Sequence, residues 1–324
     1  MYTIEELRNC IKAELDKQEY VEEPVSLFEP IKYIMEDGGK RLRPVLALLA
    51  YNLYRDDVEK ILKSVIGIEI FHNYTLLHDD VMDDAELRRG RQTVHKKWNS
   101  NVAILSGDAA AITAYRMIET VDDEYLRRAI DGFNQVAMDV CKGQQYDMEF
   151  ETRDDVTEQE YIDMIYLKTS VLIAGSIRHG ALVAGAPEHE YNALYDFGGY
   201  LGLVFQLQDD YLDVYGDVAE FGKKIGGDIL SNKKTYMLIK ALELASPEDK
   251  AMLQEWIAKK EFDPQEKIKA VTEIYNRTGI KEVVMAKIDT YMDKSREALD
   301  KVDVPEERKV HFREMVDYIG GRKK

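Results

Sequence analysis

Proline is absent from a long middle part of this chain, and this constrains the fold more than any other feature of the sequence. The chain has 324 residues and seven prolines, none of which lies between Pro44 and Pro187. Proline interrupts helices because it lacks an amide hydrogen and its ring clashes with the preceding turn. Apolar residues in this stretch recur at three and four positions, and runs that alternate with period two are absent. The sequence therefore predicts an all-helical fold without a β-sheet.

Turn residues divide the chain into roughly a dozen predicted helices with short connections. The predicted breaks fall at 37–39, 89–91, 186–187, 221–227 and 245–248. No change in composition, low-complexity tract or fixed-period repeat suggests a second domain, so we expect residues 1–324 to form a single domain. The Gly-Gly-Tyr-Leu-Gly run at 198–202 lacks the preceding strand and the lysine of a phosphate loop, and close helix packing is the favoured interpretation.

Charge and composition exclude several functions. The formal charge of −17 argues against a general binder of nucleic acid or anionic membranes, which need a cationic surface. The two cysteines do not suggest a disulfide framework. The N-terminus lacks the pattern of a signal peptide, and the longest apolar stretch is far too short to span a membrane. We expect a cytoplasmic protein without stable membrane insertion.

The segment DDVMDD at 79–84 is the first of two acidic motifs. On a helix, Asp79 and Asp83 share a face one turn apart, where like charges repel and destabilise the helix. Mg²⁺ would compensate this repulsion, because it binds a few carboxylates, keeps several waters and bridges to phosphate oxygens. A solvated acidic turn is the alternative interpretation of this motif taken alone.

The second acidic motif, DDYLD at 209–213, lies in an apolar segment. Asp209 and Asp213 again have i, i+4 spacing, and Gln206 precedes them on nearly the same face. Carboxylates among apolar side chains are costly unless a cation pairs with them. We therefore expect the two motifs to form facing walls of one cleft and to bind divalent ions for a diphosphate substrate.

Basic residues at predicted helix edges supply the complementary charge. Arginine and lysine are the usual partners of phosphate oxygens, and arginine binds two oxygens through its planar fork. Each basic group alone is more often a solvated surface, but together in so acidic a chain they indicate a diphosphate site. They occur at 38–44 (GGKRLRP), 88–90 (RRG), 167–170 (LKTS), 221–224 (FGKK) and 232–234 (NKK).

The order of these motifs resembles that of the trans-isoprenyl diphosphate synthases, or polyprenyl synthetases. The segments that carry the resemblance, between about residues 38 and 236, are GGKRLRP, HDDVMDDAELRRG, LKTS, FQLQDDYLD, FGKKIGGDI and NKKT. The resemblance implies the isoprenoid synthase fold, with antiparallel helices around a central cavity, in a homodimer. It also implies head-to-tail condensation of isopentenyl diphosphate with an allylic diphosphate.

The resemblance further implies a role for each motif residue, with about three Mg²⁺ ions in each active site. The expected direct metal ligands are Asp79, Asp83 and Asp209. The aspartates expected to bind metal waters or complete the metal shell are Asp80, Asp210 and Asp213. The residues expected at the allylic diphosphate are Arg88, Lys168, Lys223 and Lys233. Those expected at isopentenyl diphosphate are Lys40, Arg43, His72 and Arg89.

Two further parts of the site follow from the same resemblance. Thr169 and Gln206 would lie beside the cation that develops on the allylic substrate. The basic residues 322–324 would either fold over the isopentenyl diphosphate or remain a solvated chain end.

Bulk just before the first motif limits product length in this family. Phe71 and Tyr74 are bulky and Thr75 is small, a pattern like that of synthases with products of fifteen or twenty carbons. The first motif also lacks a two-residue insertion found in many farnesyl synthases. The pattern favours geranylgeranyl over farnesyl diphosphate. On an ideal helical wheel Tyr74 points away from the Asp79 face, so this inference comes from the resemblance and not from periodicity.

Two other functions share part of the pattern. A class I terpene cyclase has a similar aspartate-rich helix, but its second metal site usually has an Asn/Ser/Glu pattern. A non-catalytic subunit that modulates a partner synthase would be expected to have lost aspartates or the arginine pair, and the chain has all of them.

Overall fold

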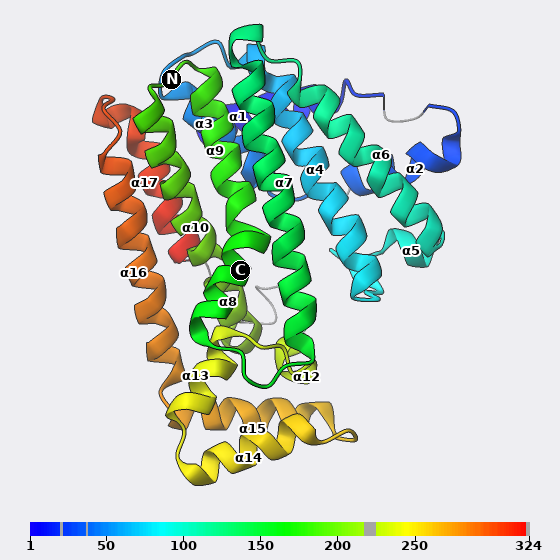
Figure 1. The fold of residues 1–324 in the computed structure, drawn as a ribbon, viewed down its shortest axis with the longest axis vertical. Coiled ribbons are helices and arrows are strands. Elements are labelled where there is room, and N and C mark those ends of the chain that lie inside the picture. Colours follow the sequence, from blue (N-terminus) through cyan, green and yellow to red (C-terminus); the bar gives the residue numbers. More distant parts are fainter. Residues whose placement is uncertain (20–21, 37, 217–224, 322–324) are drawn as a thin grey trace. The chain divides into compact units, whose positions relative to one another are not determined.

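The computed structural model describes residues 1–19, 22–36, 38–216 and 225–321, and helices dominate it (Figure 1). The chain forms two compact units. The first contains residues 1–135, 175–195 and 303–311, and the second contains the described residues among 136–174, 196–302 and 312–324. The described helices include none with the length and apolar character needed to cross a membrane.

The first unit is arranged around a central helix, α4. The elements that lie entirely in this unit are α1 (Ile4–Leu15), α2 (Val25–Met35), α3 (Leu42–Asn52), the 3₁₀ turn η1 (Val58–Ile61), α4 (Leu62–Met82), β1 (Leu87–Arg88), β2 (Arg91–Gln92), α5 (Val94–Lys97) and α6 (Ser100–Ile118). Helix α4 contacts α1, α2, α3, α5 and α6. Consecutive residues such as Val65 and Ile66 are both fully buried, because neighbours surround this helix on several sides.

Small residues allow α4 and α6 to pack closely. A β-carbon at Gly67 would lie 2.8 Å from the Ala114 carbonyl oxygen. A β-carbon at Gly107 would lie 2.3 Å from the His78 ring. The ring nitrogen Nε2 of His78 instead lies 3.1 Å from the Ile104 carbonyl oxygen. Gly67 therefore allows close approach of the α6 backbone to the N-terminal half of α4, and Gly107 leaves room for the His78 ring in its C-terminal half.

The prediction that the chain contains no sheet is wrong at one place, although the all-helical class is confirmed. Strands β1 and β2 form a two-stranded antiparallel hairpin in which Arg88 pairs with Arg91. Its turn residues, Arg89 and Gly90, both have positive φ angles, 52° and 81°. Such turns match the twist of paired strands. Two-residue strands are too short to produce a period-two pattern, so the break predicted at 89–91 marked only the turn between them.

Four long helices have residues in both units. They are α7 (Asp123–Glu151), α9 (Val171–Val183), α10 (Glu188–Tyr215) and α17 (Glu306–Gly320). The elements entirely in the second unit are α8 (Glu158–Ile165), the π turn η2 (Tyr166–Ser170), α12 (Gly227–Leu230), α13 (Tyr236–Leu244), α14 (Pro247–Ala258), α15 (Pro264–Arg277) and α16 (Ile280–Asp300). Helix α13 contacts α8, α14, α15 and α16, and α14 and α15 lie side by side in Figure 1.

Glycines fix the position of the π turn η2 within the second unit. A β-carbon at Gly143 of α7 would lie 2.2 Å from the Lys168 backbone nitrogen. A β-carbon at Gly202 of α10 would lie 2.5 Å from the Ser170 α-carbon. The prediction of close helix packing for the 198–202 run is therefore confirmed. Single π turns inside helical segments occur frequently at functional sites.

The predicted chain breaks have mixed outcomes. The break at 186–187 is confirmed, since it lies between α9 and α10. The break at 245–248 is confirmed for residues 245–246, because α13 ends at Leu244 and α14 already begins at Pro247. The breaks predicted at 37–39 and 221–227 lie partly outside the described residues. A further break at 152–157, between α7 and α8, was not predicted.

Candidate active site

The first acidic motif lies at the C-terminal end of α4. Asp79 and Asp80 belong to the last turn, and the Asp83 amide donates to the Asp79 carbonyl over 2.9 Å. Asp79 and Asp83 are therefore one turn apart along the same helix, as their spacing predicts. The C-terminal end of a helix carries a partial negative charge, which adds to the repulsion between the carboxylates. Cations near this end of α4 would offset both effects.

Arg88 on strand β1 provides one of these cations. Its Nε lies 2.7 Å from Asp80 Oδ1, and its Nη2 lies 3.2 Å from Asp79 Oδ2. Asp80 is buried, and burial raises the pKa of its carboxyl even though the Arg88 guanidinium acts in the opposite direction. The hairpin thus places Arg88 against two aspartates of the first motif.

Asp84 belongs to the same acidic run but has different surroundings. Its φ angle is +49°, so the chain leaves the helix here. The side chain is 81 % exposed, and its Oδ1 lies 2.6 Å from Lys96 Nζ. An exposed pair of this kind contributes little to stability. Asp84 is thus a natural comparison for the other aspartates of the motif.

A group of basic residues lies close to the middle of α4. Arg43 Nη1 lies 3.1 Å from His72 Nε2. Burial, followed by the charges of Arg43, Arg89 and Arg88, lowers the pKa of His72 well below its usual value. Burial also lowers the pKa of Arg43, to about 10. Since arginine can only donate, the neutral His72 accepts this hydrogen bond at Nε2. The converging cations create a positive potential that suits a diphosphate.

The loop before α3 completes this basic group. Gly39 has a φ angle of +94°, and a β-carbon there would lie 3.0 Å from Arg89 Nη1. Lys40 is exposed on the same loop. The sequence did not predict a role for Arg41, whose Nη1 lies 2.7 Å from Glu69 Oε1 in a largely buried ion pair. Glu69 is an acidic residue within the apolar sequence of α4, and this could have indicated that it has a buried cationic partner.

The residues proposed to limit product length belong to an aromatic cluster in the first unit. The Phe71 ring centroid lies 5.2 Å from that of Tyr74 and 4.9 Å from that of Phe133. The Phe133 ring in turn lies 4.9 Å from Tyr115. The Thr75 hydroxyl donates to the His72 carbonyl of its own helix over 2.7 Å. Phe71 and Tyr74 are thus supported by aromatic side chains from α6 and α7.

The second acidic motif lies near the C-terminal end of α10, where a chain of hydrogen bonds joins it to η2. Thr169 Oγ1 donates to Gln206 Oε1 over 3.1 Å, and Gln206 Nε2 donates to Asp210 Oδ1 over 3.0 Å. The Tyr161 hydroxyl donates to Asp210 Oδ2. Burial and the nearby Asp228 raise the pKa of Asp210, against the effect of these hydrogen bonds. Tyr161, for which no role was predicted, helps to fix this buried carboxyl.

The other two aspartates of this motif, Asp209 and Asp213, are half-buried on α10. Asp213 Oδ2 accepts the Asp228 backbone N–H over 3.0 Å. This contact orients Asp213 and also satisfies an amide at the start of the short helix α12. Asp228 belongs to the GGDI segment, and no role was predicted for it.

The predicted basic residues of the second unit that the structure describes, Lys168 and Lys233, contact acidic residues in different ways. Lys168 Nζ lies 2.5 Å from Asp147 Oδ2 on α7, a partner that no sequence motif indicated. The Lys233 backbone N–H donates to the Asp228 carbonyl over 2.9 Å. Lys223 and the basic residues 322–324 lie outside the described residues.

Comparisons with known proteins identify the family. A sequence profile described as "Polyprenyl synthetase" matches residues 24–275, which is more than half of the chain. The chain belongs to the polyprenyl synthetase family. It is 39 % identical over 286 residues to a short chain isoprenyl diphosphate synthase of Methanothermobacter thermautotrophicus, with 88 % of this chain and 86 % of that protein covered.

Solved structures of polyprenyl synthetases agree with this assignment. The crystal structure of a geranylgeranyl pyrophosphate synthase is 41 % identical, covers 100 % of both chains and has a TM-score of 0.95. A geranylgeranyl pyrophosphate synthase from Corynebacterium glutamicum, solved with isoprenyl diphosphate and magnesium, is 28 % identical, with 98 % of each chain covered and a TM-score of 0.86. The predicted family and the predicted isoprenoid synthase fold are confirmed.

The aspartates of this polyprenyl synthetase suit Mg²⁺ by their chemistry. Within the described part of the chain, no three or more acidic, histidine or cysteine side chains gather closely enough to hold a metal ion by themselves. Mg²⁺ does not need such a group, because it takes one or two carboxylates and completes its shell with waters and substrate phosphates. The first motif offers Asp79 and Asp83 one turn apart, and the second offers Asp209 and Asp213. These pairs fit a metal that reaches the protein together with a diphosphate.

Proposed function

We propose that this short-chain isoprenyl diphosphate synthase condenses isopentenyl diphosphate with allylic diphosphates and stops at geranylgeranyl diphosphate. The observation that supports the proposal most directly is the contact of Arg88 with Asp79 and Asp80, in which a cation suited to phosphate lies beside carboxylates suited to Mg²⁺. The twenty-carbon product is supported by the aromatic cluster around Tyr74 and by the 41 % identity to a geranylgeranyl pyrophosphate synthase.

The two acidic motifs would hold about three Mg²⁺ ions in each active site. The proposed ligands are Asp79, Asp80, Asp83, Asp209, Asp210 and Asp213. When bound, Mg²⁺ would neutralise charge that gathers on the departing diphosphate. The basic residues proposed to bind the same diphosphate are Arg88, Lys168, Lys223 and Lys233. Their charges stabilise the leaving group most strongly as the allylic C–O bond breaks.

Thr169 and Gln206 are proposed to stabilise the allylic cation. Because Gln206 Nε2 donates to Asp210, the Gln206 amide presents its oxygen to the Thr169 hydroxyl. Both oxygens keep lone pairs that can face a positive charge. Neither group is a good nucleophile at neutral pH, so the cation is stabilised without being captured.

Isopentenyl diphosphate is proposed to bind the basic group around α3 and α4. The residues involved are Lys40, Arg43, His72 and Arg89. Neutral His72 uses Nε2 to accept from Arg43, so its remaining N–H can donate to a phosphate oxygen. The isopentenyl double bond would then attack the cation, and a proton would leave to the departing diphosphate.

Labelled isopentenyl diphosphate tests the activity directly. We expect incorporation with dimethylallyl, geranyl and farnesyl diphosphates in the presence of Mg²⁺, a twenty-carbon end product by chromatography, and no incorporation after chelation. A cyclic hydrocarbon would favour the terpene cyclase alternative. Failure to condense with any allylic partner would favour a non-catalytic subunit.

Replacing Tyr74 by alanine is expected to lengthen the product. The change removes a ring that packs against Phe71, and a hydrocarbon chain could occupy the space. Chromatography of the prenyl alcohols after phosphatase treatment would show products beyond twenty carbons. Tyr318→Ala, at an exposed tyrosine of α17, is the control and should leave the product unchanged. An unaltered product from Tyr74→Ala would remove Tyr74 from this role.

A homodimer is proposed from the surface of α6. Leu105 and Ile112 lie two turns apart on one face of α6 and are 59 % and 63 % exposed. Large exposed apolar groups on one helix face indicate a protein interface. Ile112→Glu should convert a dimer to a monomer in light scattering, whereas Met252→Glu, at an exposed methionine of α14, should not. A wild-type enzyme that is already monomeric would contradict the proposal.

A further inference from the structure

Lys267 on α15 is a buried lysine without an acidic partner among the described residues. The residue is 1 % exposed, and Nζ donates to Asn232 Oδ1 over 2.7 Å and to the Leu230 carbonyl over 3.3 Å. Nζ also lies 4.2 Å from the Phe262 ring centroid. An ammonium group in such surroundings is costly unless its hydrogen bonds compensate for the lost water. An apolar side chain of similar length would avoid this cost, so the ammonium calls for a specific explanation.

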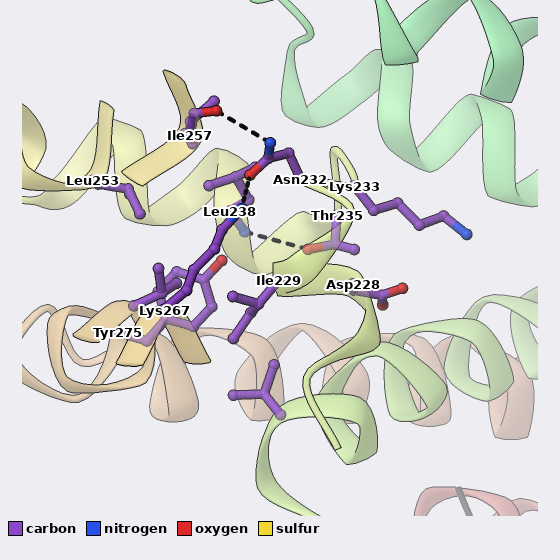
Figure 2. A pocket seen from close by; sticks show the side chains of 12 residues that line it. Asp228, Ile229, Asn232, Lys233, Thr235, Leu238, Leu253, Ile257, Lys267 and Tyr275 are labelled. Carbon is purple, nitrogen blue, oxygen red and sulfur yellow. Dashed lines mark hydrogen bonds between the residues drawn. The ribbon is translucent and has the colours of Figure 1, made fainter. Parts of the chain in front are cut away.

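Asn232 is fixed by Lys267 on one side and by α14 on the other. Its Oδ1 accepts from Lys267 Nζ, while its Nδ2 donates to the Ile257 carbonyl over 3.1 Å. Its φ angle is +56°, a left-handed conformation that asparagine tolerates better than most residues. Figure 2 shows these side chains converging on the loop between α12 and α13. Both ends of the Asn232 amide are thus used to hold an unusual backbone conformation.

The left-handed turn at Asn232 determines the position of the backbone of the next residue, Lys233. The Lys233 backbone N–H donates to the Asp228 carbonyl over 2.9 Å, and its carbonyl accepts from the Thr235 amide over 2.8 Å. In Figure 2 the Lys233 side chain extends away from Lys267 and Asn232, on the side where Asp228 lies. A lysine side chain has many rotamers and does not fix its own direction. The position of its α-carbon therefore strongly influences where the ammonium can reach.

We propose that Lys267 is a positioning residue that holds Asn232 in its left-handed conformation and thereby directs Lys233 to the allylic diphosphate. This inference rests on the proposed function, in which Lys233 contacts that diphosphate. The hydrogen bond to the Leu230 carbonyl fixes the same loop two residues earlier. Lys267 touches no substrate in this scheme and acts through the loop alone.

Two variants test the role of Lys267. Lys267→Met keeps the apolar stem and removes the ammonium, and Asn232→Gly keeps the left-handed backbone accessible but removes the amide. We expect Lys267→Met to raise KM for the allylic diphosphate roughly 10- to 100-fold, because displacement of a binding group by about 1 Å has effects of this size. KM for isopentenyl diphosphate should stay unchanged. Asn232→Gly should raise the allylic KM less, since glycine can still adopt the turn.

The control for loss of a buried lysine is Lys309→Met. Lys309 is 4 % exposed and pairs with Glu306 on its own helix. This variant should lower the melting temperature but leave both KM values unchanged. If Lys267→Met lowers the melting temperature without changing the allylic KM, Lys267 has only a structural role and the proposal is wrong.

A double-mutant cycle separates this proposal from the proposed function. Lys233→Met should itself raise the allylic KM, and Lys267→Met should add little in the Lys233→Met background, because both changes act through one contact. Full additivity would show that Lys267 acts independently of Lys233 and would overturn the proposal. A Lys233→Met variant with a normal allylic KM would instead contradict the role of Lys233 in the proposed function.

Discussion

Replacing Asp79 by asparagine is expected to lower kcat about 100- to 1,000-fold, because a charged Mg²⁺ ligand worth several kcal/mol in the transition state is lost. Asp79 lies in the last turn of α4, one turn before Asp83 and beside Arg88. Asparagine keeps the size and one oxygen but removes the negative charge. The variant should also need more Mg²⁺ for half-maximal rate. Steady-state rates over a Mg²⁺ titration measure both effects.

Asp84→Asn is the matched control for this experiment. Asp84 lies in the same acidic run, yet its carboxylate is exposed and pairs with Lys96. The same chemical change there should leave kcat and the Mg²⁺ requirement within about twofold of wild type, since exposed pairs contribute little. If Asp84→Asn were as damaging as Asp79→Asn, the run would act through its total charge and not through particular ligands.

The sequence predicted those parts of the site that depend on local helical geometry. The spacing of Asp79 and Asp83, and of Asp209 and Asp213, predicts pairs one helical turn apart. The structure places Asp79 in the last turn of α4 with Asp83 as its C-cap residue, and Asp209 and Asp213 on α10. The start of α8 could also have been predicted from a local sequence pattern. Thr157 and Glu160 form a capping box, in which Thr157 is the N-cap and the helix begins at the next residue, Glu158.

Contacts between distant segments could not be predicted in the same way. The partner of Lys168 is Asp147, 21 positions earlier, and the partner of Asp210 is Tyr161, 49 positions earlier. These pairs depend on how α7, η2 and α10 pack, and no spacing rule connects them. The hairpin that carries Arg88 is similar, because it depends on a left-handed turn at an arginine. Composition and periodicity do not predict contacts between segments that are far apart in the sequence.

The π turn η2 was also unpredictable from the sequence, and it carries two residues of the proposed site, Lys168 and Thr169. A π turn closes one residue later than an α-turn and has no characteristic composition. Here its position is defined by glycines on the helices against which it packs.

Gly143→Ala is expected to damage both stability and activity. The new β-carbon would lie 2.2 Å from the Lys168 backbone nitrogen and 2.6 Å from the Leu167 carbonyl carbon. Both are backbone atoms, so no side-chain rotation relieves the overlap and η2 must move. We expect the free energy of unfolding to fall by about 1–3 kcal/mol, as in overpacked cores. Since Lys168 and Thr169 move with the turn, kcat/KM for the allylic diphosphate should fall roughly 100-fold.

Gly132→Ala, on the same helix α7, is the control because it makes the identical chemical change where there is space. The nearest atom to its β-carbon would be Arg178 Nη1, at 3.8 Å. Alanine is the better helix former, so this variant should be more stable by about 0.5–1 kcal/mol, with wild-type activity. The two substitutions should therefore change the free energy of unfolding in opposite directions, which urea unfolding measures. Steady-state kinetics on both variants measures the activity. Equal behaviour of the two variants would show that η2 does not depend on contact with Gly143.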